Sequence, residues 1–137
     1  MTFLNHNVRS FNANSNLFCS TFIQNNILPD LICLSETWNT FDSQPDINDY
    51  NGFHTYRNLG RSGGVSLYTK SDFNARKVDQ LSFSSNSIEI CTIDIKVPDL
   101  SFAVVAVYRS PNSEYEHFQN LLYRCFLILQ LEIKSLS

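Results

Sequence analysis

The sequence predicts an α/β domain, and three observations support this prediction. Short apolar runs typical of strands lie on either side of one helical segment near the start of the chain. Alternating apolar residues predict further strands in the middle, and a clear amphipathic helical pattern follows them. With 137 residues, of which 43% are hydrophobic and 17% charged, the chain is long enough to bury one core.

A strand, a helix and a second strand are predicted first. Residues 3–8 are extended in character, and the polar cluster after them can start a helix through Asn14 or Ser15. Pro29 ends that segment. The apolar face of the helix recurs at helical spacing and consists of Phe18, Cys19, Phe22 and Ile23. Residues 31–34 form a continuous apolar run, too short for a helix and typical of a strand covered on both faces.

Loop and turn signals fill the next part of the chain. Residues 37–51 are polar and include Pro45, which indicates a long surface loop. All four glycines lie between positions 52 and 64, and the Gly63–Gly64 pair leads into an alternating strand from Val65. The same segment has no acidic residue and contains three basic ones, Arg57, Arg61 and Lys70. It is therefore a locally basic patch.

A hairpin and a helix are predicted for the remainder. Apolar residues alternate from Ile88 and change phase before Ile93, a pattern that predicts a β-bulge. A turn around Pro98 separates this strand from the valine-rich run at 102–108, with which it should pair. An amphipathic helix should begin near Ser113 or Glu114. Its apolar positions are Phe118, Leu121, Leu122, Cys125, Phe126, Leu129 and Ile133.

Glu36 is an acidic residue placed just after the predicted buried strand at 31–34. In α/β sheets functional groups collect where strands end, and a carboxylate there can be a hard oxygen ligand for Mg²⁺ or Mn²⁺. The alternative is that Glu36 caps the loop or pairs with an arginine. Position alone favours this structural interpretation.

Composition limits the class of protein. The net charge of −3 provides no general attraction to nucleic acid, so phosphate binding would need a local basic patch or a bridging metal ion. The four cysteines are far apart in apolar surroundings, which favours free thiols in a reducing compartment. No apolar run is long enough to span a bilayer, and no signal peptide is visible. We expect a soluble, intracellular protein without a membrane partner, in either nucleus or cytoplasm.

Four motifs resemble one family in their order and spacing. They are NVRSF at 7–11, LSETW at 34–38, GRSGGVSLYTK at 60–70 and VYRSPNS at 107–113. They resemble the endonuclease/exonuclease/phosphatase superfamily, and most of all the apurinic-endonuclease-like domain of non-LTR (LINE-type) retrotransposons. The resemblance implies a DNase I-like, four-layer α/β sandwich with a mixed β-sheet and covering helices.

The resemblance also implies an active site. It makes Glu36 the principal metal ligand, Asn7 a catalytic asparagine at the same metal, and Tyr108 a tyrosine near the scissile phosphate, with Mg²⁺ or Mn²⁺ as cofactor. Asn5 is a rival for the role of Asn7, and Arg9 stands where apurinic endonucleases carry an acidic residue. Taken without the family, Asn7 could be a turn former and Tyr108 a core aromatic with its hydroxyl at the surface.

Four further residues are candidates for substrate binding. Trp38 and Arg109 directly follow motif residues, so they can flank the substrate groove, but loop packing and a salt bridge explain them equally well. Arg57 and Arg61 can contact phosphate, and plain solvated charge is an even alternative for both.

The resemblance covers only part of the family domain. The Gly-Asp-x-Asn and Ser-Asp-His motifs that follow the tyrosine motif in the family are absent from this sequence. Residues 1–137 are therefore expected to be a single truncated domain, the N-terminal half, with one sheet whose apolar face lacks its partner.

Two functions remain open from the sequence. The first is a metal-dependent DNA endonuclease of the retrotransposon type, which nicks target DNA to leave a 3′-hydroxyl and is fused to a reverse transcriptase in the full element. The second is a non-catalytic remnant with no turnover.

Overall fold

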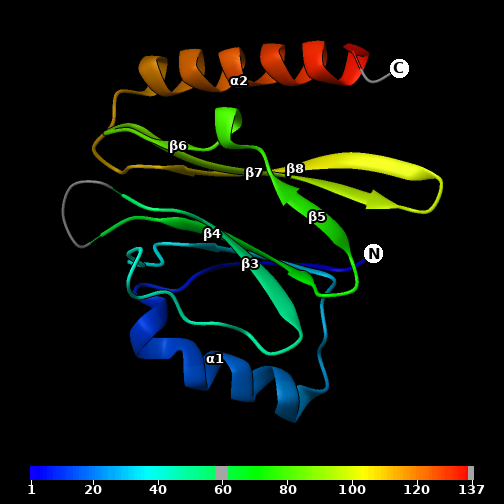
Figure 1. Ribbon diagram of the computed structural model, residues 1–137. Helices are drawn as coiled ribbons and strands as arrows, with labels where there is room; N and C mark the ends of the chain where they lie inside the picture. The colour runs from blue at the N-terminus through cyan, green and yellow to red at the C-terminus, as the bar shows by residue number, and fades with distance from the viewer. Residues whose placement is uncertain (58–61, 136–137) are drawn as a thin grey trace.

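The computed structural model describes residues 1–57 and 62–135. Four layers are stacked in the order helix, sheet, sheet, helix (Figure 1). The expectation of a single sheet with an uncovered face is wrong, because strands from the second half of the chain form a second sheet that packs on the first. The α/β class, the mixed sheet and the covering helices are confirmed.

The first sheet has the strand order β1-β2-β4-β3 and is mixed. Its strands are β1 Phe3–Asn7, β2 Leu31–Ser35, β3 Tyr50–Thr55 and β4 Val65–Lys70. β1 and β2 are parallel and the other pairs are antiparallel. The parallel pair requires a crossover, and α1 Phe11–Asn25 supplies it. β3 was not predicted, since the glycine-rich sequence around Gly52 gives little apolar alternation.

The helix α1 begins earlier than the polar cluster suggested. Ser10 precedes it, and the Ser10 Oγ accepts a hydrogen bond at 3.4 Å from the Ala13 amide, the amide that an N-cap side chain commonly binds. The Asn14 side chain instead donates to the carbonyl oxygens of Val8, Arg9 and Ser10. Asn14 therefore stabilises the loop before the helix from inside the first turn.

The second sheet is antiparallel and built around one long strand. That strand is β7 Ile88–Val97, which pairs with β8 Leu100–Arg109 along one edge and with β5 Asn74–Lys77 and β6 Phe83–Ser84 along the other. A short 3₁₀ turn, Asp79–Leu81, lies between β5 and β6. The helix α2 Tyr115–Ser135 covers the outer face (Figure 1).

The predicted β-bulge in β7 is absent. The register with β8 is unbroken from the Ile88–Arg109 pair to the Val97–Leu100 pair. The phase change arises because both faces of β7 are buried: Ile88 and Ile90 pack toward α2, whereas Ile93 and Ile95 pack toward the first sheet. The apolar residues therefore move from one face to the other without a change in pairing.

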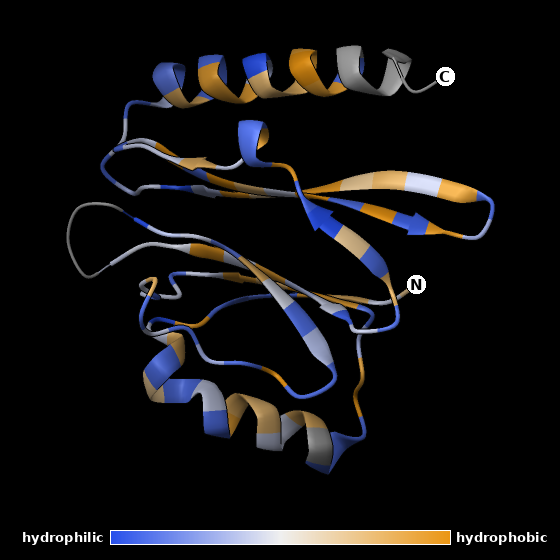
Figure 2. Cartoon of the chain, in the orientation of Figure 1, coloured by the Kyte–Doolittle hydropathy of each residue, from blue (hydrophilic) through white to orange (hydrophobic). Residues whose placement is uncertain are grey.

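Three apolar layers hold the molecule together. Between the sheets lie Leu31, Val65, Leu67, Cys91, Ile93, Ile95 and Ala106. α1 packs on the outer face of the first sheet through Phe11, Phe18 and Phe22, and α2 packs on the second through Phe118, Leu121 and Cys125. In Figure 2 both helices alternate between hydrophilic and hydrophobic residues along their length, as expected for helices with one buried face. No helix in the described residues is long and apolar enough to cross a bilayer.

The sandwich is open along one side. β1 and β8 are edge strands of the two sheets, and a groove of about 390 Å³ lies between them. Its lining is mostly apolar and includes Phe3, Leu31, Cys33, Leu67 and Val104.

Candidate functional site

Glu36 lies at the end of β2 in a backbone conformation that its neighbours hold. Its φ is +55°, in the left-handed region that a residue other than glycine seldom adopts without support. The carbonyl oxygen of Glu36 accepts a hydrogen bond from the Ser10 amide at 2.9 Å. The next two amides, of Thr37 and Trp38, donate to the carbonyl oxygens of Gly64 and Gly63 at 3.3 and 2.8 Å. Backbone hydrogen bonds thus hold the chain at Glu36 and at the two residues that follow it.

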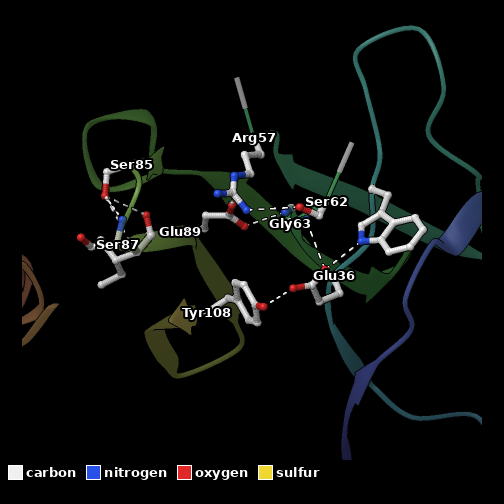
Figure 3. Close-up of polar contacts among 11 residues, drawn as sticks. Glu36, Arg57, Ser62, Gly63, Ser85, Ser87, Glu89 and Tyr108 are labelled. Atoms are coloured by element: carbon white, nitrogen blue, oxygen red, sulfur yellow. Dashed lines mark hydrogen bonds and ion pairs between the residues drawn. The ribbon is translucent and has the colours of Figure 1, made fainter. Parts of the chain in front are cut away.

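The Glu36 carboxylate accepts three hydrogen bonds (Figure 3). Its Oε1 accepts from the Tyr108 hydroxyl, and its Oε2 accepts from the indole Nε1 of Trp38 at 2.8 Å and from the Gly63 amide at 3.2 Å. Burial raises the pKa of this carboxyl, but the three donors and the charge of Arg57 outweigh burial and lower the pKa overall. Glu36 is therefore ionised at neutral pH.

Tyr108 reaches Glu36 from the other sheet. It lies on the face of β8 that points toward the first sheet, and its hydroxyl donates to Glu36 Oε1 across the space between the sheets. Burial, together with the hydrogen bond and charge of Glu36, raises the pKa of Tyr108 to about 12. The phenol is therefore neutral and acts as a hydrogen-bond donor.

A second carboxylate, Glu89, lies directly behind the site, and the sequence interpretation missed it. It is 0% exposed and pairs with Tyr108 across β7 and β8, so both side chains lie on the same face. Its Oε2 accepts a hydrogen bond from the Gly64 amide at 2.6 Å. Burial raises the pKa of Glu89. The signal in the sequence was an acidic residue between Ile88 and Ile90 in a strand that is otherwise apolar.

Arg57 and Trp38 line a shallow pocket of about 190 Å³ beside Glu36. The Arg57 Nε lies 3.9 Å from Glu89 Oε1, so the two side chains form an ion pair, but the distance is too long for a hydrogen bond. Its Nη1 lies 3.4 Å from the Ser62 hydroxyl. The remaining lining residues are Ser10, Asn39, Thr40, Ser62 and Gly63. This pocket offers a cationic group and an aromatic face next to the carboxylate.

Asn7 lies at the end of β1, next to β2. In the parallel pairing Asn7 is opposite Ser35, the residue before Glu36, and its side chain is exposed and makes no hydrogen bond within the described residues. Asn5 is opposite Cys33, two residues further back, and lines the apolar groove. Asn7 is therefore the better placed of the two for a ligand shared with Glu36.

The remaining candidates are not brought to Glu36. Arg109 follows Tyr108 in the strand and so points to the opposite face, where its guanidinium contacts Ser113 and lies over the rings of Tyr115 and Phe118. This differs from both the groove and the salt-bridge interpretations. Lys70 pairs with Asp30 at the far end of β4, so the predicted basic patch is divided. Arg61 lies outside the described residues.

The donor set fits a hard divalent cation that keeps most of its water. Carboxylate oxygens together offer about four acceptor positions, of which three are used here, so Glu36 retains room for one more partner. Mg²⁺ is commonly held by one or two carboxylates together with waters and substrate phosphate. Within residues 1–57 and 62–135, no three His, Cys, Asp or Glu side chains gather into a metal site. Glu36 could hold such a cation, and Asn7 lies at the end of the adjacent strand.

Three solved structures share the fold of this chain, and two of them are named as endonucleases. The endonuclease domain of TRAS1, a telomere-specific non-LTR retrotransposon, aligns with a TM-score of 0.64 at 13% identity, over 89% of this chain and 52% of its own. The AP endonuclease LMAP from Leishmania major gives 0.56 at 15% identity, over 89% and 43%. The Xenopus laevis APE2 catalytic domain gives 0.54 at 16% identity, over 95% and 52%. The chain thus spans about half the length of these structures or less.

Sequence comparison gives the family directly. No curated protein matches the chain. The model of the endonuclease/exonuclease/phosphatase family, however, matches residues 4–135, which include both helices and every strand except the first residue of β1. The predicted resemblance is confirmed at this level, and the chain belongs to the endonuclease/exonuclease/phosphatase family.

Proposed function

We propose that this chain carries the cation-binding and tyrosine part of a metal-dependent phosphodiesterase that acts on DNA. The observation that carries the proposal is the contact between Glu36 and Tyr108. An ionised carboxylate and a neutral phenol, one from each sheet, meet at the end of the strands beside a pocket that contains Arg57. Such a pairing provides a cation ligand and a neutral donor at one point.

The residues divide the chemistry among them. Glu36 and Asn7 would hold Mg²⁺ or Mn²⁺, which polarises a phosphodiester and stabilises negative charge on the leaving oxygen. Tyr108 donates a hydrogen bond at the same place and orients the group it contacts. Arg57 attracts phosphate electrostatically, and Trp38 provides an aromatic face for a base or sugar.

Similarity supports the class of substrate. The family model matches nearly the whole chain, and two of the aligned structures are named as the endonuclease domain of a retrotransposon and as an AP endonuclease. We therefore infer a DNA substrate, with cleavage that nicks target DNA and leaves a 3′-hydroxyl. By the same resemblance, the full polypeptide would carry a reverse transcriptase.

A second candidate is cation binding without turnover. It is favoured by the small number of acidic groups around Glu36 within the described residues. Glu89 does not add to them as a ligand, because its Oε2 is engaged by Gly64 and its side chain is fully buried.

Nicking of supercoiled plasmid separates the two candidates. The 137-residue chain would be assayed with Mg²⁺ or Mn²⁺ beside Glu36→Gln and a matched control, Glu116→Gln, on the exposed surface of α2. We expect cation-dependent nicking in the chain and in the control, and its loss in Glu36→Gln. If folded chain binds Mn²⁺, as measured by quenching of the single tryptophan, Trp38, and yet does not nick DNA, the second candidate holds.

A further inference from the structure

Glu89 is the one charged residue that is fully buried among the described residues. A buried carboxylate is costly unless it is paired, and Glu89 has two partners, the Gly64 amide at 2.6 Å and Arg57 at 3.9 Å. Both partners belong to the hairpin between β3 and β4, on the first sheet, whereas Glu89 belongs to β7 on the second. The side chain therefore crosses the interface between the sheets to reach a turn.

That turn is the Gly63–Gly64 pair, and it contacts Glu36 directly. The Gly63 amide donates to Glu36 Oε2 at 3.2 Å, while the two glycine carbonyl oxygens accept from the amides of Thr37 and Trp38. Both glycines have positive φ, +88° and +92°. The position that a Gly63 side chain would occupy is filled by Glu89 Oε1 and by the Arg57 side chain (Figure 3). Glu89 is thus in close contact with the turn that donates a hydrogen bond to the Glu36 carboxylate.

We propose that Glu89 is a positioning residue for this site: through its hydrogen bond to Gly64 it holds the Gly63–Gly64 turn, and the turn sets the orientation of the Glu36 carboxylate. The short hydrogen bond to Gly64 carries the effect. The Arg57 contact contributes less, because at 3.9 Å it is too long for a hydrogen bond. Groups behind a ligand commonly matter for metal affinity because they orient that ligand.

The role explains why an acidic residue occupies this position of β7. A simple filler of the interface between the sheets would be apolar, as are Cys91, Ile93 and Ile95 on the same face of the strand. A carboxylate reaches the Gly64 amide and also lies opposite Tyr108, the other residue that bonds to Glu36. Two residues of the second sheet therefore act on the Glu36 carboxylate: Tyr108 by direct contact, and Glu89 through the Gly63–Gly64 turn.

The test uses the single tryptophan of the chain. Because Trp38 Nε1 donates to Glu36 Oε2, its one indole N–H resonance in a ¹H–¹⁵N spectrum reports the orientation of the carboxylate. Glu89→Met keeps the volume and removes the acceptor, whereas Glu89→Gln keeps an acceptor for Gly64. Thr92→Val is the matched structural control: it removes the buried hydrogen bond of Thr92 to the Leu81 carbonyl oxygen on the opposite face of β7, away from Glu36.

Distinct results are expected for these variants. In Glu89→Met the indole resonance and the Gly63 amide should move in the direction seen for Glu36→Gln, and Mn²⁺ affinity should fall by about 10–100-fold. Glu89→Gln should remain close to the unmodified chain. Thr92→Val should lower thermal stability and leave both resonances in place. If Glu89→Met does not fold, Glu89→Asp, which withdraws the carboxylate by one methylene, should shift the same two resonances.

Unmoved resonances in a folded Glu89→Met or Glu89→Asp variant would overturn the proposal, as would an equal shift in Thr92→Val. The metal part of the inference rests on the proposed function, since Glu36 must bind the cation. The resonances do not depend on it. If the chain neither binds Mn²⁺ nor nicks DNA, the proposed function is wrong. The two resonances of the Glu89 variants still show, in that case, whether Glu89 positions Glu36.

Discussion

Gly63→Ala would add a Cβ where Gly63 is in close contact with the side chains of Glu89 and Arg57. At φ +88° an alanine costs about 1–2 kcal/mol in backbone strain. The added Cβ would also lie against the buried Glu89 carboxylate and 2.7 Å from Arg57 Cδ, and overpacking of this kind costs about 1–3 kcal/mol. Together these terms predict a loss of about 2–5 kcal/mol in the free energy of unfolding, a large part of the stability of a small domain.

Urea denaturation followed by circular dichroism measures this loss. Gly52→Ala is the matched control, because its Cβ would also meet close neighbours, the ring atoms of His54 and Tyr68 at 2.9 Å. Gly52 has no positive φ, so this variant lacks the backbone strain and should lose less free energy of unfolding than Gly63→Ala. A Gly63→Ala loss below about 1 kcal/mol, or one no larger than that of Gly52→Ala, would refute the account of the turn.

Three further predictions concern pH, the site and the core. Burial, with the charge of Lys77, lowers the pKa of His54 from 6.5 to about 4, so the neutral form stabilises the folded state above pH 6.5. That stability should be lost as pH falls from about 6.5 to 4, by up to about 3 kcal/mol, as followed by urea denaturation at each pH. Tyr108→Phe removes one donor from Glu36, so the pKa of Glu36 should rise, as measured by pH titration of tryptophan fluorescence. Ile93→Ala, at a position 0% exposed between the sheets, should cost about 2–5 kcal/mol in urea denaturation.

Each of these has an outcome that contradicts it. A His54→Gln variant with the same loss between pH 6.5 and 5 would show that His54 is not the group responsible. An unchanged or lower midpoint in Tyr108→Phe would mean that the phenol does not stabilise the Glu36 carboxylate. Val107→Ala is the control for the core, since Val107 lies on an edge strand and is 37% exposed. If Ile93→Ala and Val107→Ala lose the same free energy of unfolding, Ile93 is not part of the core.

The sequence predicted most elements and missed those without a periodic pattern. The alternation in β4 and β8 and the helical spacing in α2 depend only on neighbours along the chain, so they are readable before folding. β3 and β5 were missed because their polar and glycine-containing sequences lack an apolar alternation. The prediction of a bulge in β7 was wrong. A strand that is covered on both faces can carry apolar residues on either face, so a change of phase does not require a bulge.

The candidate site was predicted in part. The family was confirmed, and the roles of Glu36, Asn7 and Tyr108 stay predictions, although the structure joins Glu36 to Tyr108 and leaves Asn7 at the adjacent strand end. For Arg109 the sequence left the substrate groove and a salt bridge equally open, and strand alternation places its side chain on the opposite face of β8 from Tyr108.

By itself the sequence determined the family, the α/β class and the acidic residue at the end of a buried strand, since all three depend on local pattern or motif. Only the tertiary structure decided that the strands form two sheets and that Tyr108 meets Glu36 from 72 residues away. Glu89 became visible in the same way, since its partner Gly64 lies 25 residues back and on the other sheet. Contacts between sheets depend on which faces pack together, and no local periodicity encodes that choice.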